Sequence, residues 1–477
     1  MISTENSTSF TSSDEPLQKN TKNIDILRGD PKKSILALSL PMIAAMLLTS
    51  LYNVVNAIWV AGLGSDALAA VGIITPVFMI IMGIGVGIGT GTTAAIARKI
   101  GADDKNSADN TAAHAILINL VLGLILTILG YIFLEDVLIL MGAGDLVSLA
   151  VTYGNIIILG TILILFCHIM YGILRGEGDV KRTMYAMVIS SILNIILDPF
   201  LIYTCKMGIA GAAWGTIISI LFVCILLVYW TFIKRDTYIS VAKATFSYKK
   251  EIIFDILRVG IPASIEFLAM ATMSFFVNWM LITTDGADAV AVFTGGWRFV
   301  MIAMVPLIAI GMAVTAISGA MYGAKRFTDL KEVLLHGVKF SLAIAIGIAI
   351  LTYICAPYIA YLFAYSEGST HLLSGMSDFL RLMIMICPFA AFGITASCLF
   401  QGVGKGFTAL GLNLLRNLVL ISLSAYVLGI LLDLNSLGVW WGVIIGNMAG
   451  GTIGFCFALL FVRALLKVAK HADKEKS

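Results

Sequence analysis

Twelve long apolar segments follow one another along the chain, separated by short polar or glycine-rich connections. About 20 helical residues are enough to cross the roughly 30 Å hydrocarbon core of a bilayer. A backbone inside a bilayer must satisfy its own hydrogen bonds, so these segments are predicted to be α-helices. The pattern therefore predicts an all-α polytopic membrane protein. The predicted spans are residues 34–61, 68–97, 108–134, 146–173, 183–204, 209–233, 252–282, 288–321, 330–352, 376–401, 407–432 and 437–466.

The two halves of the sequence resemble each other. Residues 39–41 (Ser-Leu-Pro) correspond to 260–262 (Gly-Ile-Pro), and 175–179 (Arg-Gly-Glu-Gly-Asp) correspond to 401–405 (Gln-Gly-Val-Gly-Lys). The spacing between matched positions drifts only from 221 to 227 residues. Six spans per half is an even number, so both halves enter the membrane in the same direction. We expect a parallel internal repeat of two six-helix lobes that rock about a central cavity.

This repeat divides the chain into five parts. The tails are polar, and the longest internal connection is basic, so we expect disordered cytoplasmic ends and a cytoplasmic linker. The predicted parts are a disordered tail (1–33), an N-lobe (34–233), a linker (234–251), a C-lobe (252–466) and a second tail (467–477).

Positive charge gives the orientation of the chain. All but four of the 31 Lys and Arg residues fall on alternate connections, which places those connections and both termini in the cytoplasm. The exceptions are Lys206, Arg298, Arg381 and Arg416. The composition agrees with a membrane protein, since 59% of residues are hydrophobic and 12% are charged, with a mean hydropathy of +0.98. The net charge of +3 follows from this asymmetry and does not indicate nucleic-acid binding.

The sequence lacks the common motifs of metal-dependent enzymes and of nucleotide-binding proteins. The seven cysteines are scattered, without the short spacings of a metal site. The glycine-rich stretch 83–91 lies inside an apolar span and is not followed by the Gly-Lys-Ser/Thr of a phosphate-binding loop. We therefore expect neither an enzyme nor an ATP-driven transporter, and no cofactor.

Asp198 is the sharpest candidate for a functional residue. A charge inside the bilayer is costly, and such residues usually serve function. Asn194 lies one turn before Asp198 on the same helix face. Pro199 frees a backbone carbonyl one turn back. A carboxylate, an amide oxygen and a free carbonyl suit a proton or a small cation such as Na⁺. The alternative is that Asp198 lies at the outer end of its span and is merely solvated.

Other polar side chains in the spans of the first half could serve either helix packing or ion binding. Tyr52, Asn53 and Asn56 lie within the first span, where amides either join helices or bind a cation. Thr216 in the sixth span is more often hydrogen-bonded to its own helix.

The second half contributes Glu266 in the seventh span and Arg298 in the eighth. Paired, the two would neutralise each other; unpaired, Glu266 could carry a proton or attract a cationic substrate. Met270 and Met273 could line an adaptable cavity, although most methionines in such helices face lipid or neighbouring helices. Arg416 with Asn417 is interpreted as a structural pair.

Several blocks in this order resemble the multidrug and toxic compound extrusion (MATE) family, in its prokaryotic form. The resemblance covers about residues 28–466 and rests on residues 27–31 leading into 39–41, and on 64–72, 175–179 and 194–199. It implies an antiporter in a prokaryotic plasma membrane that expels drugs, often organic cations, as H⁺ or Na⁺ flows inward. It also implies a protein that contacts membrane lipid and functions as a monomer.

The resemblance carries over unevenly to individual residues. Asn194, Asp198 and Thr216 match the family's cation site, and Pro41 resembles the proline at which the first helix bends. Asn56 stands where the family has an aspartate. The site then has one carboxylate, so we expect Asp198 to carry the coupling ion, alone or with a contribution from Glu266. A Na⁺ ion at Asp198 is the one metal that this reading allows.

A second candidate function belongs to the wider superfamily with this two-lobed plan, which includes flippases for lipid-linked oligosaccharides. Such flippases often have fourteen spans and a more cationic central cavity. Twelve spans and few central Lys or Arg residues favour the exporter.

Overall fold

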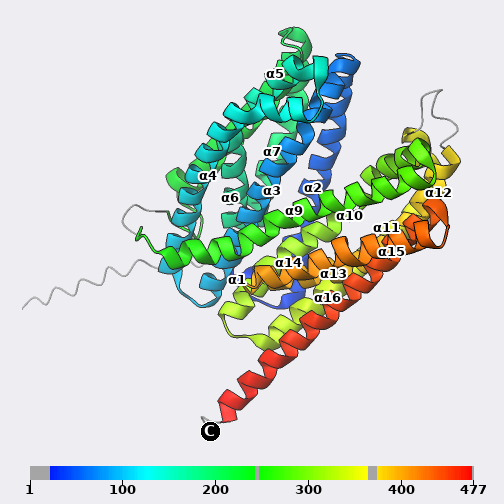
Figure 1. The fold of residues 1–477 in the computed structure, drawn as a ribbon. Helices are drawn as coiled ribbons and strands as arrows, with labels where there is room; N and C mark the ends of the chain where they lie inside the picture. Colours follow the sequence, from blue (N-terminus) through cyan, green and yellow to red (C-terminus); the bar gives the residue numbers. More distant parts are fainter. Residues whose placement is uncertain (1–21, 242–245, 364–372, 475–477) are drawn as a thin grey trace, which may run out of the picture.

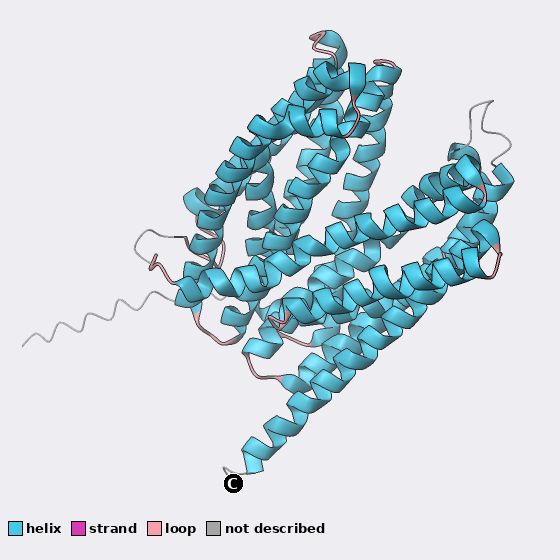
Figure 2. Ribbon diagram, in the orientation of Figure 1, coloured by secondary structure: helices cyan, strands magenta, loops and turns pink. Residues whose placement is uncertain are grey.

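The computed structural model describes residues 22–241, 246–363 and 373–474, and these residues form helices joined by short loops (Figure 2). The elements follow the chain as in Figure 1. They are α1 Lys22–Arg28, α2 Pro31–Ala61, α3 Ser65–Gly101, α4 Lys105–Leu140, η1 Gly144–Leu146, α5 Val147–Leu159, α6 Thr161–Gly176, α7 Val180–Pro199, η2 Phe200–Thr204, α8 Ile209–Val228, η3 Tyr229–Lys234, α9 Lys250–Thr284, α10 Gly286–Gly323, α11 Phe327–Phe363, α12 Leu373–Met383, α13 Ile386–Gly402, α14 Gly406–Leu414, η6 Leu415–Ile421, α15 Ser422–Tyr426, η7 Val427–Leu431 and α16 Asn435–Lys474.

The predicted spans are confirmed as helices. Within the described residues, nine helices are long and apolar enough to cross a membrane, and two bent pairs raise the number to eleven. Helix α9, which corresponds to the predicted seventh span, is 35 residues long and carries Glu266 in its interior. The bends were not predicted: α5 and α6 meet at 46°, and α12 and α13 meet at 45°.

The helices form two arms (Figure 1). Helices α2 to α8 form one arm and α9 to α16 the other. The arms converge at the end of the molecule where both described termini lie, and they diverge toward the opposite end. Across the converging end, α3 packs against α9, and α10 packs against α2 and α3.

The contact between α3 and α10 shows the internal repeat in three dimensions. A Cβ on Gly101 would lie 2.0 Å from the Ala320 carbonyl oxygen, and a Cβ on Gly323 would lie 2.0 Å from the Arg98 carbonyl oxygen. Gly101 and Gly323 are 222 residues apart, and so are Arg98 and Ala320. The two contacts are therefore equivalent under the internal repeat. Glycine is required here because any side chain would separate the backbones.

A second pair of contacts repeats in the same way. The Thr93 hydroxyl donates to the Gly172 carbonyl at 2.9 Å, and the Thr315 hydroxyl donates to the Cys398 carbonyl at 3.2 Å. Each bond ties the long second helix of its half to the fourth span of the same half. The parallel repeat expected from the sequence is therefore visible in the hydrogen bonds as well as in the arrangement of helices.

The expectation of a disordered tail through residue 33 is wrong for its last part. Residues 22–28 form α1, because Ile24 and Leu27 are one turn apart and both are buried. Asp30 then caps α2 by accepting from the Lys32 N–H at 2.9 Å, and Pro31 occupies the first turn. Residues 1–21 lie outside the described part.

The C-terminal tail and the linker also differ from expectation. Helix α16 continues to Lys474, through most of the predicted tail. The first half of the linker is docked: Tyr238 and Ile239 are buried, and the Ser240 N–H donates to Asp109 at 2.9 Å. Apolar side chains inside the basic stretch explain this docking. Linker residues 242–245 lie outside the described part.

Glu177, in the connection after α6, holds the linker. Its carboxylate accepts from the Ile239 N–H at 2.8 Å, and the residue is 1% exposed. Burial raises the pKa of Glu177 to about 8, because desolvation disfavours the charged form, and neighbouring Asp179 acts in the same direction. The folded protein therefore retains a proton at Glu177 that the unfolded chain loses near the ordinary value of 4.5.

This difference predicts that stability falls as the pH rises. Between about pH 5 and 8 the folded state binds more protons at Glu177 than the unfolded state, so the free energy of unfolding decreases across that interval and levels off above it. Glu177→Gln, which retains an oxygen for the Ile239 N–H, should show a smaller decrease in Tm from pH 5.5 to 8.5 in detergent. An unchanged decrease would contradict the assignment.

The glycine contact predicts a specific loss of stability. Gly101→Ala should destabilise the protein by about 1–3 kcal/mol, because its Cβ forces α3 away from α10. Gly72→Ala on the same helix is the control, since a Cβ there has no heavy atom within 4 Å. Thermal unfolding of both variants in detergent tests this prediction, and an equal Tm for the two would contradict it.

Candidate functional site

Two polar clusters lie inside the helical arms. The first joins Asn194 and Asp198 of α7 to Thr216 of α8, and their exposed fractions are 2%, 0% and 6%. The structure brings these three residues together, and their role in ion coupling stays a prediction. The reading of Asp198 as a solvated residue at the end of its span is wrong, because its side chain is fully buried.

Asn194 connects the other two residues. With its amide assigned so that both ends are satisfied, the nitrogen donates to the Asp198 carboxylate at 2.7 Å, and the oxygen accepts from the Thr216 main-chain N–H at 3.3 Å. The Thr216 hydroxyl donates to the Ala212 carbonyl at 3.2 Å, as the back-bonding interpretation expects. Asp198 therefore has one polar neighbour that orients it and retains free oxygen lone pairs.

The packing around Asp198 is tight on the side of α8. A Cβ on Gly215 would lie 2.3 Å from Asp198 Oδ1, so glycine is the residue that leaves room for the carboxylate. Within the described residues, no Lys or Arg forms an ion pair with Asp198. A buried carboxylate without a cationic side chain is strongly unfavourable unless it holds a proton or a cation.

Tyr52, Asn53 and Asn56, the candidates of the first span, lie on α2, and this helix packs against α7. Asn56 is half-buried, and its amide oxygen Oδ1 has no hydrogen-bond partner in the described residues. Tyr52 is half-buried and lies within electrostatic range of Asp198, as does Tyr153 of α5. Asn53 is exposed and takes no part in the cluster. The free Asn56 oxygen is one that a bound ion or water could use.

Pro41 lies inside α2, which is one unbroken helix from Pro31 to Ala61 in this conformation. Proline removes a hydrogen-bond donor and weakens the helix at one turn. Bending at Pro41 remains a prediction.

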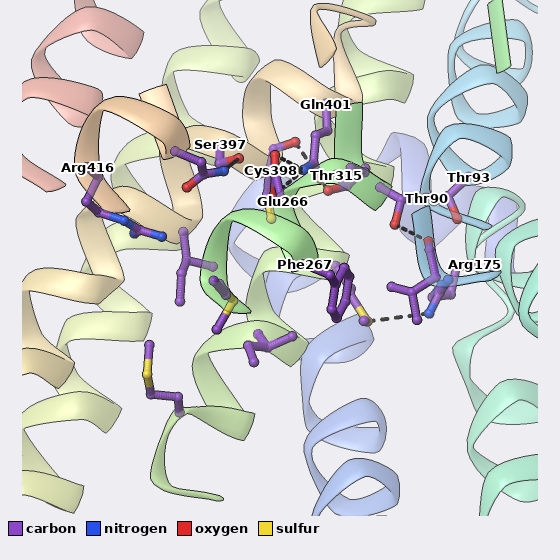
Figure 3. Close-up of a pocket in the computed structure, with 18 of the residues that line it drawn as sticks. Thr90, Thr93, Arg175, Glu266, Phe267, Thr315, Ser397, Cys398, Gln401 and Arg416 are labelled. Carbon is purple, nitrogen blue, oxygen red and sulfur yellow. Dashed lines mark hydrogen bonds between the residues drawn. The ribbon is translucent and has the colours of Figure 1, made fainter. Parts of the chain in front are cut away.

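The second cluster lines a cavity of about 200 Å³ at the converging end of the arms, which we call the floor pocket (Figure 3). Glu266 of α9 accepts from the Gln401 side-chain amide at 3.2 Å. Asn413 donates to the Ser397 hydroxyl at 2.9 Å beside it. The floor pocket is lined by Val86, Thr90, Thr93, Arg175, Ala263, Glu266, Phe267, Met270, Met301, Met304, Ile308, Met312, Thr315, Ile394, Ser397, Cys398, Gln401, Asn413 and Arg416.

Two sequence candidates do not belong to the floor pocket. Arg298 is exposed on α10 and does not line the cavity, and Glu266 is hydrogen-bonded by Gln401 instead, so the considered Glu266–Arg298 pair does not form. Met273 is 4% exposed and packs in the apolar core of the second half, whereas Met270, three residues earlier on α9, lines the cavity.

Arg175 is a site residue that the sequence reading missed. It was counted among the cytoplasmic charges, yet it is 6% exposed and lines the floor pocket from the last turn of α6. Arg416 also lines the pocket, while donating to Asn417 at 3.3 Å as the structural interpretation expected. The alignment of Arg175 with Gln401 in the repeat was the signal that could have identified it.

The two halves differ in where they carry acidic groups. The repeat places Ser424 opposite Asp198 and Gly442 opposite Gly215. Ser424 donates its hydroxyl to the Gly442 carbonyl at 2.6 Å, so the second half closes the equivalent space with a neutral bond. At this position of the repeat, the first half therefore has a buried carboxylate and the second half has a neutral hydroxyl.

The chain resembles known transport proteins over most of its length. The MatE family model matches residues 41–200 and 262–427. A probable multidrug resistance protein, YoeA, of Bacillus subtilis is 27% identical over 80% of this chain and 83% of its own. The multidrug export protein MepA of Staphylococcus aureus is 26% identical over 87% of this chain and 90% of its own.

A solved structure of similar shape is the outward-facing conformation of a multidrug resistance MATE family transporter of the MOP superfamily. It has a TM-score of 0.92 and 42% sequence identity, and the match covers 94% of this chain and 100% of that chain.

The tight packing at Gly215 predicts that a single methyl group disrupts the first cluster. Gly215→Ala should displace the Asp198 carboxylate and abolish any ion-dependent change in tryptophan fluorescence, although it removes no polar atom. Gly411→Ala is the control, since a Cβ there has no heavy atom within 4 Å. A wild-type response in Gly215→Ala would contradict this description of the site.

Proposed function

The chain belongs to the MatE family, and from this premise we propose that it is a secondary active multidrug exporter. Inward movement of H⁺ or Na⁺ drives small molecules out of the cell by alternating access of the two arms. The observation that carries the proposal is Asp198, a carboxylate buried in a membrane-spanning helix without a cationic partner among the described residues.

Asp198 serves as the ion carrier in this proposal. Its charged form needs a counter-ion, so a proton or Na⁺ binds when the site opens to the side of high ion concentration. Asn194 and Asn56 supply neutral oxygen or nitrogen groups of the kind that orient a carboxylate or coordinate a hard cation. Since Asn56 replaces the second carboxylate expected from the family resemblance, one charge per cycle is the natural stoichiometry.

Alternating access uses the contact between the arms. At the converging end, Arg98 pairs with Asp255 of α9 at 2.8 Å and donates to the Gly402 carbonyl at 2.9 Å. The distribution of Lys and Arg supports a cytoplasmic location for this end, and in this proposal the described conformation opens outward. Closing the outer end requires these cytoplasmic bonds to break, and binding or release of the ion at Asp198 biases that equilibrium.

The direct test is gradient-driven transport in proteoliposomes. Inside-out vesicles with wild-type protein should accumulate a fluorescent organic dye under an imposed H⁺ or Na⁺ gradient, and the effective gradient identifies the ion. Asp198→Asn should reduce this movement to the level of protein-free liposomes, because the amide cannot exchange a proton or balance a cation.

Asp66→Asn is the matched control, because Asp66 is an exposed carboxylate at the start of α3. Full gradient-driven transport by Asp198→Asn would overturn the coupling role. Movement of a fluorescent lipid-linked sugar with no movement of any dye would instead favour the flippase.

A further inference from the structure

The floor pocket contains more positive than negative charge. It is lined by two arginines, Arg175 and Arg416, and one carboxylate, Glu266. Figure 3 shows the two arginines on opposite sides of the pocket, with Glu266 between them. Glu266 lies within electrostatic range of Arg416, which leaves Arg175 as the unbalanced cation.

Arg175 has no acidic partner within the described residues. Its Nη1 donates to the Met312 sulfur at 3.4 Å, which is a weak acceptor, and the side chain is 6% exposed. A buried guanidinium is normally paired with a carboxylate or phosphate, because its five donors and its charge are costly to leave unmet. Its place in the last turn of α6 makes a cation tolerable at the helix end, but supplies no counter-ion.

The fold itself does not require a cation at this position. At the equivalent place in the second half, α13 ends with the same backbone turn: Gly178 and Gly404 have φ of 81° and 84°. The N–H groups of these glycines bond to the Arg175 and Gln401 carbonyls, both at 3.0 Å. The second half builds this turn with neutral Gln401, so the charge of Arg175 serves something other than the turn.

The remaining wall of the pocket is apolar and adaptable. Met270, Met301, Met304 and Met312 line it together with Phe267. Thioether side chains repack around ligands of varied shape. A ligand with an aromatic or apolar body and one anionic group would fit both parts of the lining.

We propose that the floor pocket binds amphipathic molecules that carry a carboxylate, as organic anions or zwitterions, with the carboxylate paired to Arg175. This inference rests on the proposed export function and narrows its substrate class, which the family resemblance had placed among organic cations. A planar guanidinium binds a carboxylate through two parallel hydrogen bonds, which the Met312 sulfur does not satisfy. The apolar body of the ligand then packs against the methionines.

A pair of rhodamine dyes tests the proposal, because the free acid and its methyl ester differ only at the carboxylate. Fluorescence anisotropy with purified full-length protein in nanodiscs should show about tenfold or tighter binding of the free acid, the size expected for one charge-assisted pair. Arg175→Gln should remove this preference, and Arg175→Lys, which retains the charge, should keep part of it. Arg463→Gln is the matched control, because Arg463 is exposed on α16.

Equal or tighter binding of the ester by wild-type protein would overturn the proposal, as would an unchanged preference in Arg175→Gln. A circular dichroism spectrum and Tm like those of wild type exclude misfolding of that variant, and Arg175→Lys provides a second measurement. Binding does not depend on a gradient, so an acid preference without gradient-driven transport would refute the exporter and leave the ligand class intact.

Discussion

An ionised side chain inside a bilayer must be neutralised, and this constraint organises the molecule. Asp198 is fully buried, is oriented by Asn194, and has no cationic side chain as a partner within the described residues. In the proposed mechanism, a mobile ion supplies the neutralising charge. Glu266 and Arg416 meet the same constraint differently, since they lie in one pocket within electrostatic range of each other and are surrounded by neutral donors. In the proposed mechanism, Asp198 is the carboxylate that exchanges its ion, while Glu266 stays hydrogen-bonded to Gln401.

The repeat provides two equivalent close contacts between the arms, and the proposed rocking motion would pivot there. Gly101 against Ala320 and Gly323 against Arg98 are equivalent contacts, so the arms meet across a pseudo-two-fold axis at the converging end. Close backbone contact without long side chains permits two packings of similar energy, which a rocking motion requires. The side chains at equivalent positions of the two halves nevertheless differ. Asp198 faces Gly215 in one half, while Ser424 closes the equivalent space in the other.

The sequence was sufficient for the helices, the repeat and the pairing of Asn194 with Asp198, each for a physical reason, whereas Thr216 joined them only through the family resemblance. Apolar length determines membrane helices, and a spacing of four residues places Asn194 and Asp198 on one face. The fully buried state of Asp198 was not predictable, because depth depends on where neighbouring helices end. The Glu266–Gln401 bond joins residues 135 positions apart, a tertiary contact that helical periodicity does not encode. Arg175 lies at the end of a span, so the sequence places it with the cytoplasmic charges that orient the chain. At such a position, an error of one helical turn in the predicted end of the span decides whether the side chain lies in the cytoplasm or in the pocket.

The central claim is that Asp198 carries the ion that is exchanged for cargo. The most direct measurement is the number of ions released by purified protein on addition of a transported dye, followed as H⁺ in weakly buffered solution and as Na⁺ with a sodium-selective electrode. The account predicts release of one kind of ion from wild-type protein and none from Asp198→Asn, with dye binding still detectable in both. Equal release from Asp198→Asn would show that another group carries the ion and would contradict the account.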